Sequence, residues 1–127
     1  MSVERFGSGG RWEQAVGYSR AVRAGQFVFV AGCTGVQADG ELVAGGAYEQ
    51  TQQACRNVVA ALERAGATPA DVVRTRLYVT DIEHWEQVGR AHAEVFGAAP
   101  PAASMVEVSR LIAPRMLVEV EAVAFVP

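Results

Sequence analysis

Two stretches of the chain carry apolar residues at helical spacing. The first runs from Tyr48 to Ala65, and Gly66 is well placed as its C-terminal cap. The second follows Asp81, a good N-cap, and stops before Gly97. The apolar face of the first is Ala47, Ala54, Val58, Ala61, Leu62 and Ala65, and that of the second is Trp85, Val88, His92, Val95 and Phe96. The pattern therefore predicts two amphipathic helices.

Period-two alternation and β-prone runs predict strands around these helices. The predicted strands include residues 20–23, 26–31, 72–80, 104–108 and 117–125. Ala24-Gly25 joins the first two as a tight hairpin, and the glycine-rich residues 7–10 are predicted to form a loop. The element order, with three strands ahead of the first helix, is β-β-β-α-β-α-β-β. It predicts an α+β fold over a single domain, residues 1–127, with a mixed β-sheet and two helices on one face.

The strand alternation also predicts two different faces of the sheet. The aliphatic set expected to face the helices is Val73, Thr75, Leu77 and Val79 in one strand and Val118, Val120, Ala122 and Ala124 in the other. Arg74, Arg76, Glu119 and Glu121 then project from the opposite face. A face that mixes Arg, Glu, Tyr and Phe is typical of a subunit interface with paired charges. The alternative is a solvated face whose ion pairs contribute little.

Composition narrows the possible functions. All eleven basic residues are Arg, which excludes a Schiff-base lysine, a P-loop lysine and a lysine general base. The net charge of −3 gives no electrostatic footprint for nucleic acid. Cys33 and Cys55 are predicted to be free thiols, and with His84 and His92 they form no pair at zinc-ligand spacing. No apolar run approaches the ~18 residues of a membrane span, and we expect a cytoplasmic protein.

Four blocks of the chain resemble the RidA/YjgF family. They are Gly-Tyr-Ser-Arg-Ala-Val-Arg-Ala-Gly at 17–25, Val-Phe-Val-Ala-Gly at 28–32, Pro-Ala-Ala-Ser-Met-Val-Glu-Val at 101–108 and Val-Glu-Val-Glu-Ala-Val-Ala at 118–124. The resemblance implies a chorismate-mutase-like fold and a homotrimer whose sheets form a central β-barrel, with clefts between subunits. It also implies deamination of 2-iminobutanoate and 2-iminopropanoate, with no cofactor and no metal.

The resemblance further implies a small-molecule site built from Tyr18, the Gly32 backbone and Glu119. In this site Glu119 positions water or acts as a general base, and Tyr18 forms a pocket wall with a polar tip. The alternative for Glu119 is a structural ion pair with Arg74 or Arg76, which would keep the carboxylate ionised.

The largest departure from the family lies in the segment Pro101-Ala102-Ala103-Ser104. Family deaminases have an Arg at the position of Ala103, and this Arg clamps the substrate carboxylate. The clamp makes two charge-assisted hydrogen bonds of about 1.5–3 kcal/mol each. Their loss predicts imino-acid binding weaker by roughly two to four powers of ten, unless Arg76 or Arg110 takes over the role.

Further departures surround the same expected cleft. Met105, which with Ser104 belongs to the predicted ligand-binding set, stands where the family often has Cys. Ala31 replaces a Ser and Gly89 an Asn found in family members. The changes predict a roomier, more apolar pocket whose main fixed charge is Glu119, and hence a neutral or cationic ligand.

The remaining candidates each have a functional and a structural interpretation. Cys33 is expected at the cleft rim, as a reactive thiol or as a small apolar filler. His92 is expected to be a hydrogen-bonded core or interface histidine rather than a catalytic one. Trp12 either covers a cleft or is simply packed, and Cys55 is expected in the core.

Three functions remain open at this point. One is a deaminase-type hydrolase of a small imine, enamine or related metabolite, and another is a trimer that binds or senses a small ligand without catalysis. The third is RNA cleavage, suggested by an older family label as L-PSP-type endoribonucleases, which the acidic chain without lysine disfavours. The missing clamp at Ala103 is the feature that separates the first two.

Overall fold

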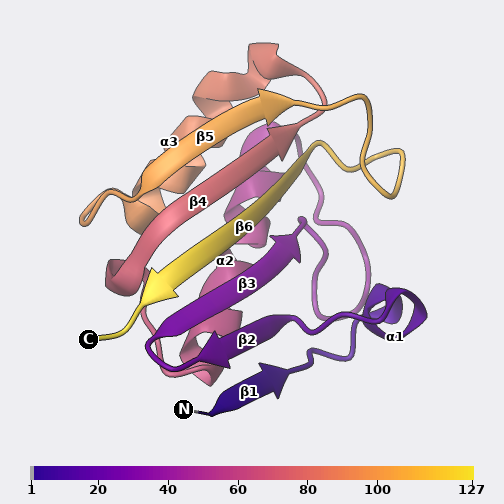
Figure 1. The fold of residues 1–127 in the computed structure, drawn as a ribbon. Helices are drawn as coiled ribbons and strands as arrows, with labels where there is room; N and C mark the ends of the chain where they lie inside the picture. Colours follow the sequence, from indigo (N-terminus) through magenta and orange to yellow (C-terminus); the bar gives the residue numbers. More distant parts are fainter. Residues whose placement is uncertain (1) are drawn as a thin grey trace.

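Six strands and three α-helices make up residues 2–127 in a computed structural model of the protein (Figure 1). In chain order the elements are β1 (Val3–Phe6), α1 (Arg11–Val16), β2 (Ala21–Ala24), β3 (Phe27–Cys33), α2 (Ala47–Arg64), the 3₁₀ turn η1 (Pro69–Asp71), β4 (Val72–Val79), the 3₁₀ turn η2 (Ile82–His84), α3 (Trp85–Phe96), β5 (Ala102–Glu107) and β6 (Val118–Phe125). The predicted order of the strands and the two main helices is confirmed. Helix α1 was not predicted from the sequence, because six residues are too few to show helical periodicity.

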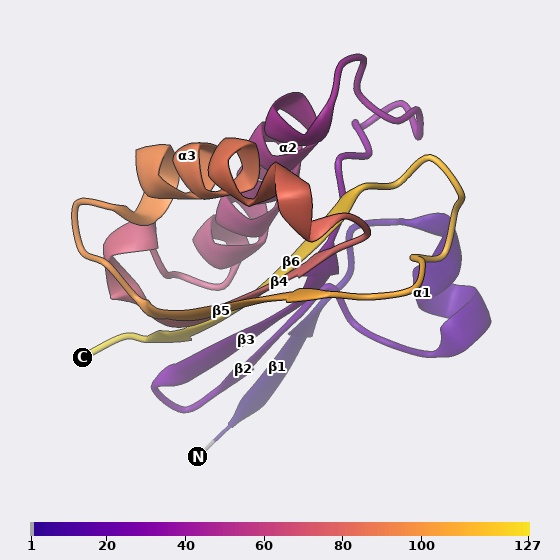
Figure 2. The same cartoon turned by 90° about the horizontal axis from the view of Figure 1, so that it is seen from above.

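The strands form one mixed sheet in the order β1-β2-β3-β6-β4-β5. Neighbouring strands are antiparallel except β4 and β5, which are parallel and are connected through α3. Helices α2 and α3 lie over one face of the sheet, and within residues 2–127 the other face of the central strands carries no helix (Figure 2). This arrangement confirms the predicted mixed sheet with two helices on one face.

The core lies between the covered face of the sheet and the two helices. Its fully buried larger side chains include Val58 and Leu62 from α2, Val88 and Phe96 from α3, Val28 from β3, Val79 from β4, and Val118 and Val120 from β6. Burial of each such side chain contributes about 1.5–3 kcal/mol. The alternation predicted for the last strand is confirmed, since Glu119 and Glu121 lie between buried neighbours and are only partly buried.

Strand β4 departs from the predicted alternation at its beginning. The prediction that Val73 faces the helices is wrong, because Val73 is 48% exposed whereas Val72 is 3% exposed. A β-bulge between Val72 and Arg74 in the pairing with β6 shifts the alternation by one residue. From residue 75 onward the predicted alternation holds.

The start of α3 also differs from the prediction. Asp81 does act as a cap, but for η2, where its carboxylate accepts a hydrogen bond from the Glu83 N–H at 3.0 Å. Helix α3 then begins at Trp85, whose side chain is 56% exposed, so its predicted place on the apolar face is wrong. Trp85 lies one turn ahead of Val88, the first buried residue of α3, and no element of residues 2–127 covers it.

The open face of the sheet carries exposed aromatic side chains. Phe27 and Phe29 are each 46% exposed. The Phe27 ring stacks on Phe29 and on Phe125, with ring centroids 6.2 Å and 5.2 Å apart. Contiguous apolar surface of this kind is typical of an interaction site. Within residues 2–127, no helix combines the length and the apolar character that crossing a bilayer requires.

Candidate small-molecule site

The Arg20 side chain connects three residues of the expected site. Its Nη2 donates to the Tyr18 hydroxyl oxygen at 3.1 Å, and its Nη1 donates to the Gly32 carbonyl at 2.6 Å and contacts Cys33 Sγ at 3.4 Å. Its Nε lies 3.5 Å from Oε2 of Glu13. Arg20 directly precedes β2 and Gly32 lies in β3, so one side chain ties both strands together. Sequence reasoning singled out neither Arg20 nor Glu13, and the only signal for Arg20 was its place inside the first family block.

Glu119 lies against the backbone of Gly32. The register between β3 and β6 shifts between Val30 and Cys33, which places Gly32 at the irregularity beside β6. A Cβ atom at Gly32 would lie 2.9 Å from Glu119 Cγ and closer still to the carboxyl group, so this approach requires glycine. The structure thus brings three predicted site residues together with two that were not predicted, Arg20 and Glu13. The group is here called the Arg20 cluster: Glu13, Tyr18, Arg20, Gly32 and Glu119.

The two carboxylates of the Arg20 cluster have different electrostatic surroundings. Burial and the neighbouring Glu121 raise the pKa of Glu119, and the charge of Arg20 offsets this only in part. Burial also acts to raise the pKa of Glu13, but hydrogen bonds from the Ser8 side chain and backbone and the charge of Arg20 outweigh it and lower that pKa. Glu13 therefore stays ionised beside Arg20, whereas Glu119 is better suited to exchange a proton.

Within residues 2–127, Glu119 forms an ion pair with neither Arg74 nor Arg76, the partners that its structural interpretation required. Arg76 pairs with the next carboxylate of β6 instead, with Nη1 3.5 Å from Glu121 Oε1. The same oxygen accepts a hydrogen bond from the Tyr78 hydroxyl at 2.7 Å. Glu121 therefore has two structural partners, whereas Glu119 is left to the Arg20 cluster.

A hollow of about 290 Å³ lies on the open face beside the Arg20 cluster. Its lining includes Ser19, Val22, Phe29 and Ala31 on one side and Arg76 and Glu121 on the other. Ser19 and Ala31 are chain neighbours of cluster residues, so the hollow and the cluster adjoin. Its lining is largely apolar, with the Arg76–Glu121 pair as its charged part.

Ala103, Ser104 and Met105 lie on β5, away from the Arg20 cluster. In the sheet, β6 and β4 separate β5 from β3, which corresponds to about 14 Å at ~4.8 Å per strand. Ala103 and Ser104 are exposed, and Met105 packs against the core. Ser104 Oγ accepts a hydrogen bond from Arg74 Nη2 at 2.9 Å. Within one chain the predicted site is therefore split between the Arg20 cluster and the β5 segment (Ala102–Glu107).

The other polar candidates lie outside both parts. His92 Nε2 and the Thr75 hydroxyl are 2.9 Å apart, and burial lowers the pKa of His92, as expected for a hydrogen-bonded core histidine. The Trp12 ring lies 4.5 Å from the Arg11 guanidinium carbon and is partly buried. Arg110 is exposed in the loop after β5.

Both cysteines are buried free thiols. Burial raises the pKa of Cys33 although Arg20 acts in the opposite direction, and burial raises the pKa of Cys55 to about 12. A thiol with a raised pKa is a poor nucleophile, which favours the filler role for Cys33. Within residues 2–127, no group of three or more His, Cys, Asp or Glu side chains is placed to hold a metal ion.

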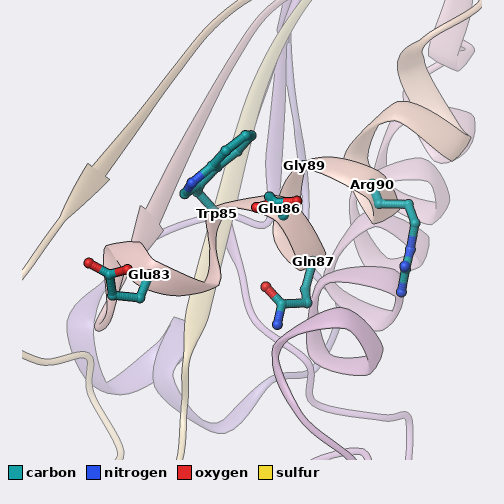
Figure 3. A pocket seen from close by; sticks show the side chains of 6 residues that line it. All are labelled: Glu83, Trp85, Glu86, Gln87, Gly89 and Arg90. Atoms are coloured by element: carbon teal, nitrogen blue, oxygen red, sulfur yellow. The ribbon is translucent and has the colours of Figure 1, made fainter.

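A larger hollow, of about 670 Å³, lies along the first turns of α3. The residues that line it are Glu83, Trp85, Glu86, Gln87, Gly89 and Arg90 (Figure 3). Their side chains point in different directions rather than toward a common centre. A Cβ atom at Gly89 would meet no atom within 4 Å, so this surface is open at Gly89. Within a single chain the hollow holds no converging polar groups.

Comparisons with known proteins cover nearly the whole chain. The sequence pattern of the family described as endoribonuclease L-PSP matches residues 10–126. A RutC family protein from Pyrococcus abyssi is 41% identical over 110 residues, which is 85% of this chain and 85% of the relative. Human 2-iminobutanoate/2-iminopropanoate deaminase is 32% identical over 109 residues, which is 84% of this chain and 78% of the relative. The crystal structure of Rv2704 from Mycobacterium tuberculosis, a member of the YjgF/YER057c/UK114 family, superposes on this chain with a TM-score of 0.91. The two sequences are 53% identical, and the match covers 98% of this chain and 100% of that one.

Proposed function

This chain belongs to the endoribonuclease L-PSP family, which includes the RidA/YjgF proteins, and from that premise we propose that it deaminates a small imine or enamine lacking a carboxylate. The human relative is named for deamination of 2-iminobutanoate and 2-iminopropanoate. The proposed reaction is the same hydrolysis, without a cofactor, on a neutral or cationic substrate.

The environment of Glu119 is the observation that carries this proposal. The carboxyl group is partly buried against Gly32, and burial together with Glu121 raises its pKa. A carboxylate with a raised pKa exchanges protons nearer to neutral pH and is a more effective general base. The Tyr18 hydroxyl, held by Arg20, adds a second polar group to the same cluster.

In the proposed reaction Glu119 accepts a proton from a water molecule as the water oxygen bonds to the imine carbon. The nitrogen of the resulting adduct takes up that proton, which gives a carbinolamine. The carbinolamine hydroxyl then gives up its proton while the nitrogen gains one, the C–N bond breaks, and ammonia leaves. Imine and water thus give a carbonyl compound and ammonia, with no change of oxidation state. The chemistry requires a proton acceptor beside an apolar hollow, which supports Glu119 in this role.

The missing clamp supports the choice of substrate class. The methyl group of Ala103 offers no hydrogen bond to a carboxylate. The charge of Glu119, partly buried, would repel a second carboxylate nearby. Both effects disfavour 2-imino acids relative to imines without a carboxylate.

We also propose that the site is completed between copies of the chain in a homotrimer. In one chain the β5 segment lies about 14 Å from Gly32 on β3 and about 10 Å from Glu119 on β6, so the two parts do not close around one small ligand. The exposed rings of Phe27 and Phe29 and the Arg76–Glu121 pair on the open face fit an interface. In a trimer, the β5 segment of one copy would lie near the Arg20 cluster of the next. Light scattering should give three times 13.5 kDa, and a mass of 13.5 kDa at micromolar concentration would contradict this assembly.

A matched pair of imines tests the reaction and its substrate class. An amino-acid oxidase acting on L-2-aminobutanoate gives 2-iminobutanoate. An amine oxidase acting on propylamine gives the imine that has the same carbon skeleton without the carboxylate. We expect the protein to accelerate ammonia release from the second imine more than from the first. Faster turnover of 2-iminobutanoate would contradict the proposed substrate class.

The alternative function is binding of the same ligand class without catalysis. Position 103 favours it, because a chain without the clamp has lost the residue that most distinguishes the family's deaminases. Saturable binding of the uncharged probe 2-oxobutanamide, with no acceleration of either imine, would establish this alternative.

A further inference from the structure

Arg20 is more completely bonded within the chain than the other arginines near the site. Its side chain is 15% exposed and Glu13, its acidic partner, is 9% exposed. The guanidinium donates to Tyr18 and to the Gly32 carbonyl, and its carbon lies 5.4 Å from the centre of the Tyr18 ring. With Glu13 balancing its charge, Arg20 is not a free cation that could replace the clamp at Ala103.

The Arg20–Tyr18 contact has only one possible direction. A guanidinium carries donors and no acceptor, so the Tyr18 oxygen must accept this hydrogen bond. The hydroxyl proton of Tyr18 therefore points away from Arg20. Within residues 2–127 no side chain or carbonyl accepts that proton, and Tyr18 is 36% exposed. The proton is thus available to a bound molecule.

The same guanidinium also holds the backbone beside Glu119. Its Nη1 donates to the Gly32 carbonyl at 2.6 Å, and Gly32 is the residue against which Glu119 packs. Tyr18 and Glu119 come from segments about a hundred positions apart. Arg20 donates a hydrogen bond to Tyr18, and its charge acts on Glu119. The relative placement of a donor and a proton acceptor therefore depends on one side chain.

We propose that Arg20 is a positioning residue that aims the Tyr18 hydroxyl proton at the carbonyl-like or imine atom of the bound ligand. Glu13 contributes to this positioning, because its carboxylate keeps the guanidinium in place. The inference rests on the proposed function in one respect only, the identity of the ligand that receives the proton. The orientation of the hydroxyl is a property of the unliganded protein.

A double-mutant cycle tests the coupling between Arg20 and Tyr18. The probe is 2-oxobutanamide, and its affinity is measured for the unmodified protein, Arg20→Gln, Tyr18→Phe and the double variant. A guanidinium only donates, whereas the Gln amide can also accept the Tyr18 proton, so Arg20→Gln should free the hydroxyl from its single orientation toward the ligand. We expect each single variant to weaken binding about five- to tenfold, and the double variant to be no weaker than Tyr18→Phe. Arg20→Lys, which like Arg has donors and no acceptor, should recover part of the affinity.

Arg23→Gln is the matched control. Arg23 also lies in the β2–β3 hairpin and also donates to backbone carbonyls, at 3.0 Å to Gly25 and 2.8 Å to Ala65, but it does not contact Tyr18. We expect it to leave the affinity unchanged. A further weakening by Arg20→Gln in the Tyr18→Phe background, as large as in the unmodified protein, would overturn the proposal.

A second measurement needs no ligand and separates this inference from the proposed function. The ¹³Cζ resonance of labelled Tyr18 reports the hydrogen bonding of its hydroxyl. It should move in Arg20→Gln, return toward its original position in Arg20→Lys, and stay unchanged in Arg23→Gln. An unchanged resonance in folded Arg20→Gln would overturn the proposed role of Arg20. Absence of probe binding to the unmodified protein, with the resonance moving as expected, would instead count against the proposed function.

Discussion

The Arg20 cluster and the β5 segment differ in how firmly the single chain holds their side chains. In the Arg20 cluster, one guanidinium donates to Tyr18 and Gly32 while Glu13 is bonded to Ser8. In the β5 segment, residues 102–104 are exposed, and the two side-chain hydrogen bonds described there join Arg74 to Ser104 and the Ile82 N–H to Glu107 at its far end. The Arg20 cluster is therefore the part that the chain's own hydrogen bonds hold more firmly.

This difference means that a substitution at position 103 would disturb little of the chain's own structure. No described hydrogen bond or ion pair involves the Ala103 side chain, and replacing it disturbs no buried contact. Gly32 is the opposite case, because any side chain there would overlap the Glu119 carboxyl group. A site built from one constrained and one unconstrained part can change its ligand without loss of its fold.

The largest expected effect is on catalysis. Glu119→Gln removes the proposed general base and should slow deamination of the propylamine-derived imine by at least about 100-fold. In the unmodified protein the rate should rise with pH as Glu119 ionises, at a pH above that of an ordinary Glu because its pKa is raised. Glu121→Gln removes a neighbouring charge that raises this pKa, so it should move the midpoint of the pH–rate profile downward. A Glu119→Gln variant with unchanged rate would remove Glu119 from the mechanism.

Gly32→Ala should damage the constrained part of the site. The new methyl group must displace Glu119, which we expect to destabilise the protein by about 1–3 kcal/mol and to lower the turnover rate. Urea unfolding and the imine assay measure both effects on one sample. Unchanged stability together with unchanged turnover would show that the close approach of Gly32 and Glu119 does not matter.

The two carboxylates of the Arg20 cluster should respond oppositely to neutralisation. The lowered pKa of Glu13 means that its ionisation stabilises the fold above the unfolded-state pKa, and that this contribution is lost as pH falls through the lower folded-state pKa. Glu13→Gln should therefore be less stable than the unmodified protein at pH 7, by about 1–2 kcal/mol, with the gap narrowing in acid.

The raised pKa of Glu119 has the reverse sign. Its protonated form is favoured by folding, so stability is highest below the unfolded-state pKa and falls as pH rises through the folded-state pKa. Glu119→Gln should melt above the unmodified protein at pH 7 and match it near pH 4. Thermal melts of both variants between pH 4 and pH 8 give the comparison, and shifts of the same sign at pH 7 would contradict it.

The smallest expected effect comes from Gly89→Ala in α3. A Cβ atom there meets nothing within 4 Å, and Gly inside a helix is less stable than Ala by about 0.5–1 kcal/mol. The variant should therefore melt a few degrees higher, whereas Gly32→Ala melts lower. A drop in melting temperature for Gly89→Ala would mean that the surface along α3 is covered in the assembled protein.

The parts of the fold that were predictable are those set by local pattern. The apolar stripe of α2 and the alternation of β6 follow from spacing alone, because burial on one face imposes the period. Val73 and Trp85 were misplaced because their exposure depends on other segments. The bulge at Val72–Arg74 arises from pairing with β6. The exposed Trp85 lies at the junction where η2 ends and α3 begins.

The candidate site was predictable only in part, for a related reason. Tyr18, Gly32 and Glu119 could be singled out by their resemblance to family positions. The role of Arg20 could not, because it depends on a side chain that crosses from the start of β2 to a carbonyl twelve positions later. The pairing of Arg76 with Glu121 rather than Glu119 likewise depends on strand register, which alternation alone does not settle.

Binding of 2-oxobutyrate tests most directly the claim that Ala103 has re-specified the site. Calorimetry would compare the unmodified protein with Ala103→Arg and with Ala102→Arg, which adds the same charge at the neighbouring exposed position on the other face of β5. The account predicts that Ala103→Arg binds 2-oxobutyrate at least tenfold more tightly than the unmodified protein, and that Ala102→Arg does not. Equal affinity of the unmodified protein and Ala103→Arg would contradict the account, because another cation would then already serve the carboxylate.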